Sequence, residues 1–520
     1  MFARWWKMLR STPGSHEDPQ ALQSVAAWGK KRQDADALFA AHRHADALPL
    51  YEDLYTRDAQ APGLLLRLGL VYGATGRLDQ AEIFLARAKE QGSHSIDLLN
   101  AQANLAWLRG QWSLAEQRFR EALEIAPDNP TLWANRGLCL HDAGSLLEAA
   151  AALDRAIALD PQHVDARVNA ALVCMDRGEL AAAGAHLQHA LTAAPDFAEA
   201  HTLRAQWLLL QADYAGGWRE YEWRARCSDV LPPGDVVLPR WNGATQERLV
   251  IYAEQGLGDQ IMFASCLPDV LERVSQVEIE CDPRLAALFA RSFPSVRVHA
   301  QTPGLERPWA AAQTGQASQI WCGSLPRWFR RAQSAFPPHS GYLSADATKT
   351  AHWARQLAAL GDGLKVGIAW RGGVPRTRQA MRSVALTQWL PILQMPGVRC
   401  VSLQHDACDE ELGQINGMPN VHLIHWSPAN GDYEETAALI AALDVVITVC
   451  SSVVHLAGAL GKTTCVLVPT CPEWRYLLSG EVMPWYPSVR LFRQSSPGDW
   501  PSVVERIRHT LTAYRSVKSA

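Results

Sequence analysis

The sequence lacks several features that would assign a chain quickly to a class. It has no continuous apolar run of the roughly 18–20 residues that a membrane-spanning helix needs. Its eleven cysteines include no C-x-x-C pair. Cysteines that are odd in number and scattered suit buried thiols in a reducing compartment better than a disulfide framework, so we expect a cytoplasmic protein. The net charge of −4 gives no electrostatic case for nucleic acid or an anionic membrane as a partner.

Common catalytic and metal-binding motifs are also missing. No Asp-x-Asp follows a predicted strand, no cysteine–histidine spacing suits zinc, and no Gly-x-Ser-x-Gly would present a serine nucleophile. We therefore expect chemistry without an essential metal or cofactor. Residues 1–10 carry basic and aromatic side chains without an apolar core or cleavage site, so we expect no signal peptide. They are either a disordered start or a short amphipathic segment that lies on a membrane or partner.

The first half of the chain contains a repeat of 34 residues. Three prolines, Pro127, Pro161 and Pro195, mark the interval. Four further series keep it: Gly76, Gly110, Gly144 and Gly178; Ala81, Ala115, Ala149 and Ala183; Leu85, Phe119, Leu153 and Leu187; and Ala88, Ala122, Ala156 and Ala190. This pattern resembles the tetratricopeptide repeat (TPR), in which small residues lie where two helices cross and a glycine ends the first helix.

We predict four clear repeats between about 62 and 195, with degenerate copies at 35–57 and 199–226. Such arrays stack into a superhelix whose concave face usually holds a peptide or protein, so a protein partner is expected there. The alternative is that the array only braces or dimerises the rest of the chain. The predicted parts are an N-terminal segment with a degenerate repeat at 1–60 and a TPR array at 61–228.

The second half alternates strand-like and helix-like segments after a proline- and glycine-rich linker at 229–247. The predicted strands are 249–253, 276–280, 296–299, 320–322, 365–370, 399–403, 421–424, 445–449 and 463–468. Helical patterns between them predict parallel sheets joined by crossover helices. We place one α/β domain at 248–345 and a second at 346–520, whose final helix, 500–514, is expected to return across the first domain. Two such domains that face each other would bind ligand at the carboxyl ends of their strands.

The junction between the first strand and its helix is the most informative motif, Glu254-Gln255-Gly256-Leu257-Gly258-Asp259. Its two glycines let the backbone turn tightly and approach a ligand. The following helix, expected to start near Gln260, would offer unpaired N–H groups and a positive dipole end to an anion. Asp259 is therefore either a helix cap or a base.

A second junction follows the strand 445–449 and carries Ser451, Ser452, His455 and Gly458. The two hydroxyls can bond the first amides of the next helix or a diphosphate. His455 would lie one turn further along at the same end. An ordinary serine cap beside a packed histidine is the alternative, and the combination with the first junction favours ligand binding.

Arginines follow another strand of the second domain. Arg371 comes directly after this strand, where its guanidinium can neutralise a phosphate in a bidentate manner. Arg376, Arg378 and Arg382 follow in a loop; a solvated loop is the alternative, and we expect a diphosphate contact from Arg382 among them. Aromatic residues at 472–476, 484–487 and 491–494 would either stack on a base or sugar or form part of a structural core.

From residue 216 to residue 500 the sequence resembles bacterial TPR glycosyltransferases. Their C-terminal halves are similar to lipopolysaccharide heptosyltransferases and, more distantly, to repeat-containing O-linked N-acetylglucosamine transferases. The matching pieces are Gly217 to Arg224, Glu254 to Asp259, Val366 to Trp370, Arg382-Ser383, Ser402 to Gln404, Leu456 to Gly461 and Pro484 to Gln494. The resemblance implies an α-helical TPR superhelix followed by an α/β GT-B fold of two facing Rossmann-like domains. The first would hold the acceptor and the second most of the nucleotide-sugar.

The resemblance also implies residue roles. Asp259 is expected to be the general base of an inverting, metal-independent transfer that deprotonates the acceptor hydroxyl. Nucleotide-sugar contacts are expected from Gly256, Gly258, Gln260, Arg371, Arg382, Gln404, Ser451, Ser452, His455 and Gly458. The family usually has Asp-Thr-Ser where this chain has Cys450-Ser451-Ser452, so the hydroxyls are kept and a carboxylate is lost.

Three functions remain open at this point. One is sugar transfer to a protein acceptor recruited by the array, such as flagellin or another surface protein. The second is transfer to lipopolysaccharide or another glycan, with the array serving assembly only. The third is a non-catalytic TPR adaptor with a degenerate transferase half, which the change at Cys450 favours and the retained Asp259 loop opposes. The sequence specifies neither the sugar (hexose, heptose or nonulosonate), nor its nucleotide, nor the oligomeric state.

Overall fold

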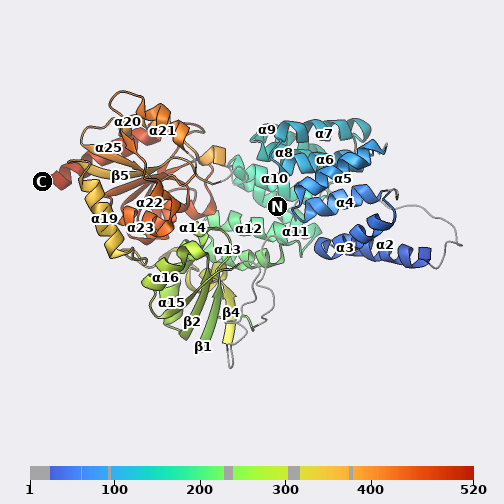
Figure 1. Cartoon of the computed structure of the whole chain (residues 1–520), viewed down its shortest axis with the longest axis horizontal. Helices are drawn as coiled ribbons and strands as arrows, with labels where there is room; N and C mark the ends of the chain where they lie inside the picture. The colour runs from blue at the N-terminus through green and yellow to red at the C-terminus, as the bar shows by residue number, and fades with distance from the viewer. Residues whose placement is uncertain are drawn as a thin grey trace. The chain divides into compact units, whose positions relative to one another are not determined.

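The computed structural model describes residues 24–41, 43–59, 61, 63–91, 95–227, 238–302, 317–373, 379–406 and 408–519. The expectations for residues 1–10 and for Arg376 and Arg378 lie outside these ranges. The chain divides into two compact units, one of Met1–Leu203 with Trp223–Asp229 and one of Arg204–Glu222 with Val230–Ala520. Figure 1 labels their elements. Among the residues so described, no helix has both the length and the apolar character that crossing a bilayer requires.

The first unit is a succession of helix pairs. Its elements are α2 (Ser24–Ala40), α3 (His44–Arg57), α4 (Leu64–Ala74), α5 (Leu78–Glu90), α6 (Ile96–Leu108), α7 (Trp112–Ile125), α8 (Pro130–Asp142), α9 (Leu146–Leu159), α10 (Val164–Asp176), α11 (Leu180–Ala193) and the beginning of α12 (Ala198–Leu210). From α2 to α11, each helix packs most extensively on its partner in the same pair, and α3, α5, α7 and α9 also pack on the helix that follows. The predicted TPR array is therefore confirmed.

The repeated residues explain this packing. The glycines that follow α4, α6, α8 and α10 all have φ between 72° and 86°, the left-handed conformation that ends a helix. The two alanine series and the larger apolar series are almost fully buried. Gly69 and Gly137 lie where helices cross, because an added Cβ would come within 2.5 Å and 2.6 Å of the Leu85 and Leu153 side chains. Small residues at these positions allow the helices to approach closely.

The second unit contains the end of α12, the helix α13 (Tyr214–Tyr221) and a four-stranded parallel sheet of order β3-β2-β1-β4. The sheet and its helices are β1 (Gln246–Tyr252), α14 (Leu257–Ala264), α15 (Leu267–Leu271), β2 (Val274–Cys281), α16 (Ala286–Ser292), β3 (Val296–Ala300), β4 (Ala317–Trp321) and α18 (Pro326–Phe329). The indole of Trp218 in α13 donates to the Arg330 carbonyl over 2.8 Å and contacts the rings of Phe263, Trp474 and Trp485. The helix α13 is thus part of the aromatic core of this unit.

A seven-stranded sheet of order β10-β11-β9-β8-β5-β6-β7 completes the second unit, with β10 antiparallel to β11. Its elements are α19 (Ala347–Ala358), β5 (Leu364–Ala369), α20 (Leu390–Leu393), β6 (Val398–Ser402), α21 (Asp409–Asn416), β7 (Leu423–Ile424), α22 (Ser427–Gly431), α23 (Tyr433–Ala442), β8 (Val445–Val449), α24 (Ser452–Ala459), β9 (Thr464–Val468), β10 (Val482–Met483), β11 (Tyr486–Arg493) and α25 (Trp500–Ser519). The predicted fold class, two Rossmann-like sheets after a TPR array, is confirmed.

Three details differ from the sequence-based expectations. The helix after β1 begins at Leu257 rather than near Gln260 and ends at Ala264, before the short helix α15 with its early proline. The aromatic stretch at 486–493 is an additional strand, β11, paired with β9. The final helix α25 packs on the second sheet, where Val503, Ile507 and Leu511 join its core, so the expected return across the first sheet is wrong. Its apolar face matches the sheet that immediately precedes it.

Candidate functional site

The loop that begins the site connects β1 to α14. Gly256 occupies the cap position of α14, and no side chain caps this helix, so Asp259 lies in the first turn without a capping role. Glu254 is buried and accepts a hydrogen bond from the Gly323 backbone N–H over 3.0 Å. Gln255 adopts φ of 65°, unusual for a residue with a side chain, and bonds the Tyr221 hydroxyl. The loop is therefore held in one conformation from both sides.

Asp259 forms an ion pair that joins the two sheets of the second unit. Its Oδ1 contacts Nη2 of Arg475, which follows β9 in the second sheet. Arg475 also pairs with Glu473 over 3.3 Å, and Glu473 pairs with Arg382 over 2.5 Å. Burial opposes ionisation of Arg475, but the charges of Asp259 and Glu473 prevail and raise the pKa of its guanidinium. The Arg475 guanidinium also lies 4.5 Å from the centre of the Trp474 ring.

The first turns of α14 and α24 touch each other next to this ion pair. A Cβ on Gly258 would lie 2.8 Å from Cδ2 of His455 and 3.5 Å from the Ser452 Cα. Gly258 is thus required for close helix packing. His455 is buried, and its Nδ1 lies 3.0 Å from the Tyr486 hydroxyl. Burial, with a contribution from Arg475, lowers the pKa of His455 to about 3, so the imidazole is neutral at physiological pH.

The serines at the start of α24 occupy the positions predicted for them. Ser451 caps the helix, because its hydroxyl accepts from the Val453 backbone N–H over 3.3 Å. The same hydroxyl lies 3.1 Å from that of Thr448 at the end of β8. Ser452 is the first residue of α24. Further along the helix, Gly458 lies against Tyr486, where an added Cβ would come within 2.4 Å of the ring.

Two of the predicted site residues have amides that bond to backbone groups. Gln404 is buried, and its Oε1 accepts from the backbone N–H groups of Trp370 and Arg371 over 3.1 Å each. Gln260 is also buried and accepts from the Asp282 N–H over 2.9 Å. Both glutamines therefore position loops at the carboxyl ends of strands.

Arg371 lies at the end of β5, beside the end of β8. It forms ion pairs with Asp406 over 3.1 Å and Glu411 over 2.8 Å. The following residue, Gly372, approaches the Cys450 carbonyl so closely that a Cβ would come within 2.3 Å of it. The Cys450 thiol is buried, and burial raises its pKa to about 12. Its sulfur lies 3.6 Å from the Leu467 carbonyl on the neighbouring strand β9.

The structure therefore brings together Asp259, Gly258, His455 and Arg382 around an arginine that the sequence analysis did not single out. Arg475 and its partner Glu473 lie within the 472–476 segment, which was considered only for its aromatic residues. The signal that would have indicated them is their place after β9, a central strand of a parallel sheet, because charged residues at such carboxyl ends face a ligand site.

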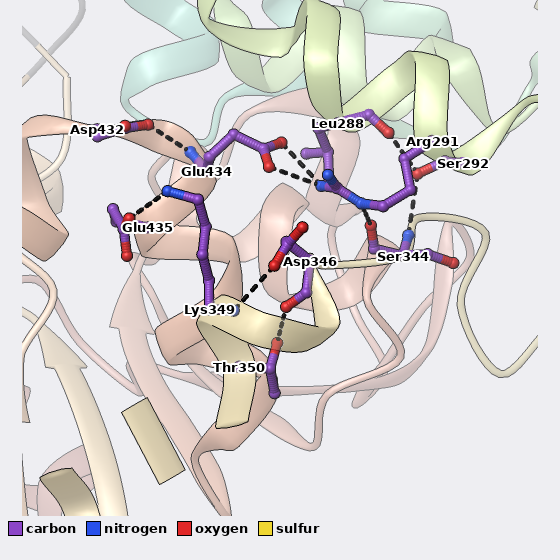
Figure 2. Close-up of polar contacts among 10 residues, drawn as sticks. All are labelled: Leu288, Arg291, Ser292, Ser344, Asp346, Lys349, Thr350, Asp432, Glu434 and Glu435. Atoms are coloured by element: carbon purple, nitrogen blue, oxygen red, sulfur yellow. Dashed lines mark hydrogen bonds and ion pairs between the residues drawn. The ribbon is translucent and has the colours of Figure 1, made fainter. Parts of the chain in front are cut away.

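A second group of polar contacts links the two sheets near the start of α19, away from Asp259 in sequence (Figure 2). Arg291 in α16 donates to both carboxylate oxygens of Glu434 in α23, over 2.8 Å each, and to the Ser344 carbonyl. The Ser344 N–H donates to the Ser292 hydroxyl over 2.9 Å. Lys349 pairs with Glu435, the residue next to Glu434. We call Arg291, Ser292, Ser344 and Glu434 the inter-sheet clamp.

Family models identify the repeat part of the chain. Tetratricopeptide repeat models match residues 38–105, 100–164 and 140–206. Among solved structures, YrrB, a TPR protein with an unusual peptide-binding site, matches with a TM-score of 0.27 and 22% identity, covering 36% of this chain and 99% of that one. E. coli ADP-heptose lps heptosyltransferase II matches with a TM-score of 0.40 and 14% identity, covering 52% of this chain and 100% of that one.

Two curated proteins are similar in sequence. Protein CTR9 homolog of Arabidopsis thaliana is 28% identical over 140 residues, which cover 27% of this chain and 12% of that protein. Protein FlbA of Caulobacter vibrioides (strain ATCC 19089 / CIP 103742 / CB 15) is 33% identical over 421 residues. That similarity covers 77% of this chain and 70% of FlbA. A similarity of this extent spans both the repeats and the α/β half, and the chain belongs to the FlbA family.

Proposed function

We propose that this chain is a glycosyltransferase that moves a sugar from a nucleotide-sugar donor to a protein acceptor recruited by its TPR array. The observation that carries the proposal is the meeting of Asp259, in the first turn of α14, with Arg475 beyond β9 of the second sheet. A carboxylate and several arginines at the carboxyl ends of two parallel sheets match what transfer from a diphosphate requires. The residue-level resemblance to TPR glycosyltransferases supports the same reaction.

In this proposal Asp259 accepts the proton of the acceptor hydroxyl while the hydroxyl oxygen attacks the anomeric carbon from the face opposite the diphosphate. The bond from the anomeric carbon to the phosphate oxygen breaks, and its electron pair leaves with the diphosphate. The configuration of the sugar is therefore inverted. Arg371, Arg382 and the N-terminus of α24, with Ser451 and Ser452, would stabilise the leaving group without a metal ion.

The remaining predicted residues are proposed to support this geometry. Gly256 and Gly258 would let the acceptor-side loop approach the donor, and Gln260 and Gln404 would hold the two loops through backbone groups. His455 is neutral, so it would act as a hydrogen-bonding neighbour of the donor rather than as a counter-ion. Gly458 would bring α24 against Tyr486 behind the site.

The acceptor is proposed to be a protein because TPR arrays most often present a concave surface to a peptide segment. Flagellin or another surface protein is the candidate that follows from the resemblance to TPR glycosyltransferases. Transfer to a glycan would leave the array with an assembly role only.

The test begins with thermal-shift screening of the full chain against UDP-, GDP-, ADP- and CMP-sugars. The donor that stabilises the chain is then incubated with candidate acceptor proteins, and mass spectrometry records the added sugar. We expect Asp259→Asn to abolish transfer while donor binding remains. Glu481→Gln is the matched control. This carboxylate is exposed, and the ion pair that the structure describes for it is with Arg490. Full turnover by Asp259→Asn would remove Asp259 as the base.

A further inference from the structure

We infer that Arg475 is a phosphate-binding residue. Its guanidinium holds Asp259 in an ion pair until the diphosphate of the donor binds the guanidinium in place of the carboxylate. This inference rests on the proposed function and adds an order of events to it. Donor binding would release the base, so the donor would bind productively before the acceptor. Asp259 would then be available only when a sugar is in place to be transferred.

Charge alternates along four side chains that link the two sheets. Asp259, Arg475, Glu473 and Arg382 form a continuous row of carboxylate and guanidinium groups, joined by three ion pairs. All four side chains are at least three-quarters buried, with Arg475 14% and Asp259 18% exposed. The two positive and two negative charges balance without a ligand. A diphosphate that enters this row must therefore compete with the carboxylates for the arginines.

Arg475 lies close to the N-termini of α14 and α24. Its guanidinium bonds Asp259, and the adjacent residue Gly258 lies in contact with His455 and Ser452 in the first turn of α24. An anion bound at that N-terminus would therefore lie beside Arg475. A guanidinium has N–H donors on more than one edge and binds phosphate in a bidentate manner, so it can transfer from a carboxylate to a phosphate.

The two carboxylate partners of Arg475 are held differently. Glu473 lies two residues away on the same loop, and it also holds Arg382 over 2.5 Å, so it fixes both arginines to the second sheet. Asp259 lies in α14, beside the first sheet, and contributes only the carboxylate of its ion pair with Arg475. When phosphate oxygens replace Asp259 as partner of Arg475, Glu473 keeps the arginine in place. The freed carboxylate then accepts the proton of the acceptor hydroxyl, and Arg475 neutralises the departing diphosphate.

The test is a double-mutant cycle on the binding of inorganic pyrophosphate, measured by calorimetry with the full chain. We expect Asp259→Asn to tighten pyrophosphate binding about three- to tenfold, because Arg475 no longer has to leave a carboxylate. We expect Arg475→Gln to weaken it about tenfold or more. In the Arg475→Gln background, Asp259→Asn should bring no further change. Arg490→Gln, at an exposed ion pair on β11, controls for the loss of one positive charge.

Two results would overturn the inference. One is unchanged or absent pyrophosphate binding in Asp259→Asn. The other is equal tightening by Asp259→Asn with and without Arg475, which would mean that the carboxylate repels the anion directly. If circular dichroism shows that Arg475→Gln does not fold, Arg475→Lys takes its place. We then expect Arg475→Lys to bind pyrophosphate more weakly than the wild type, and Asp259→Asn to have a smaller effect in this background. The cycle needs no sugar transfer, so it can fail while transfer is detected, and transfer can fail while the coupling is found.

Discussion

At the scale of single residues, the two glycines of the β1–α14 loop have different tasks. Gly258→Ala would place a Cβ 2.8 Å from the buried His455 ring, whereas a Cβ on Gly256 would meet only the Asp259 carboxylate at 3.7 Å. Gly256 also has a negative φ that other residues adopt. We expect Gly258→Ala to lower the free energy of unfolding by about 1–3 kcal/mol through overpacking. Gly256→Ala, measured in the same urea titration, should stay near the wild type, and equal losses would contradict this assignment.

The residues of the site differ in how far the sequence could predict them. Asp259 and Ser451 follow strands with clear apolar runs, and ligands lie at the carboxyl ends of parallel strands, so the sequence indicates both as candidates. In the structure Asp259 lies in the first turn of α14 and Ser451 caps α24. Their roles still rest on the proposal. The pairing of Asp259 with Arg475 spans 216 residues and depends on how two sheets pack, which no local pattern encodes. The support roles of Gln260 and Gln404 likewise depend on backbone groups far along the chain.

At the scale of elements, a buried histidine links three successive repeats. His141 in α8 lies 2.8 Å from Asp142 and 2.8 Å from Asp176 in α10, and the Trp107 indole in α6 donates to Asp142. Burial opposes the charge, but the two aspartates outweigh it and raise the pKa of His141. A raised folded-state pKa stabilises the fold fully below the unfolded value of about 6.5, and this stabilisation is lost as pH rises through the folded value.

We therefore expect the α6–α8–α10 segment to become less protected as pH rises above about 6.5 and through the raised pKa of His141. Hydrogen exchange of peptides from these helices, corrected for the intrinsic pH dependence of exchange, measures this protection in the full chain. His141→Gln should remove most of the pH dependence. Burial lowers the pKa of His186. This residue is present in the wild type and in His141→Gln, so its contribution to the pH dependence cancels in the comparison. A variant that keeps the full pH dependence would exclude His141 as its source.

The helix α13 is anchored by one indole. Trp218 is 1% exposed, packs among aromatic rings and donates to the Arg330 carbonyl. We expect Trp218→Ala to lower the free energy of unfolding of the α/β half by about 3–5 kcal/mol, because it leaves a large cavity and an unpaired carbonyl. Trp218→Phe keeps most of the packing and should cost less. Urea unfolding followed by far-UV circular dichroism compares the two, and equal costs would mean that the hydrogen bond carries the effect.

A helix or strand could be predicted from the sequence where the residues that determine it lie close together in the chain. The repeats were predictable because a glycine, two alanines and a large apolar residue recur in phase, and each performs the same packing task in every copy. The strand β11 was missed because Pro484, Pro487 and a dense run of aromatics obscure its pattern. It forms because residues Val489 to Arg493 pair in parallel with β9, a tertiary contact. The break between α14 and α15 is visible only once Pro268 is placed at a helix start.

At the scale of the α/β half, the inter-sheet clamp is expected to make its two sheets unfold together. Arg291 and Glu434 are 29% and 14% exposed, so their ion pair, in which one guanidinium nitrogen contacts both carboxylate oxygens, is partly shielded from solvent. We expect Arg291→Met to cost about 1–2 kcal/mol, between the values for surface and buried pairs. Arg291→Met/Glu434→Leu should recover part of this loss because no charge is left unpaired. Calorimetric unfolding measures both, and no recovery in the double variant would contradict a direct interaction.

For the whole chain, the array is expected to select the acceptor. Removal of residues 1–197 retains α12, α13 and both sheets. We expect this truncated chain to bind the donor with unchanged affinity but to lose transfer to the protein acceptor, as measured by calorimetry and mass spectrometry. Undiminished transfer to the same protein would show that the array does not recruit it and would favour a glycan acceptor.

The anchoring of α13 by Trp218 has a consequence for how such chains diversify. Because α13 belongs to the core of the α/β half, a recombination joint placed before α12 exchanges the repeats without opening that core. Engineered hybrids built at this joint can combine one α/β half with many repeat surfaces. A joint placed after α13 would separate the Trp218 indole from the aromatic rings around it. The boundary that keeps this packing therefore lies before the α12–α13 pair, one helical pair before the end of the repeat pattern.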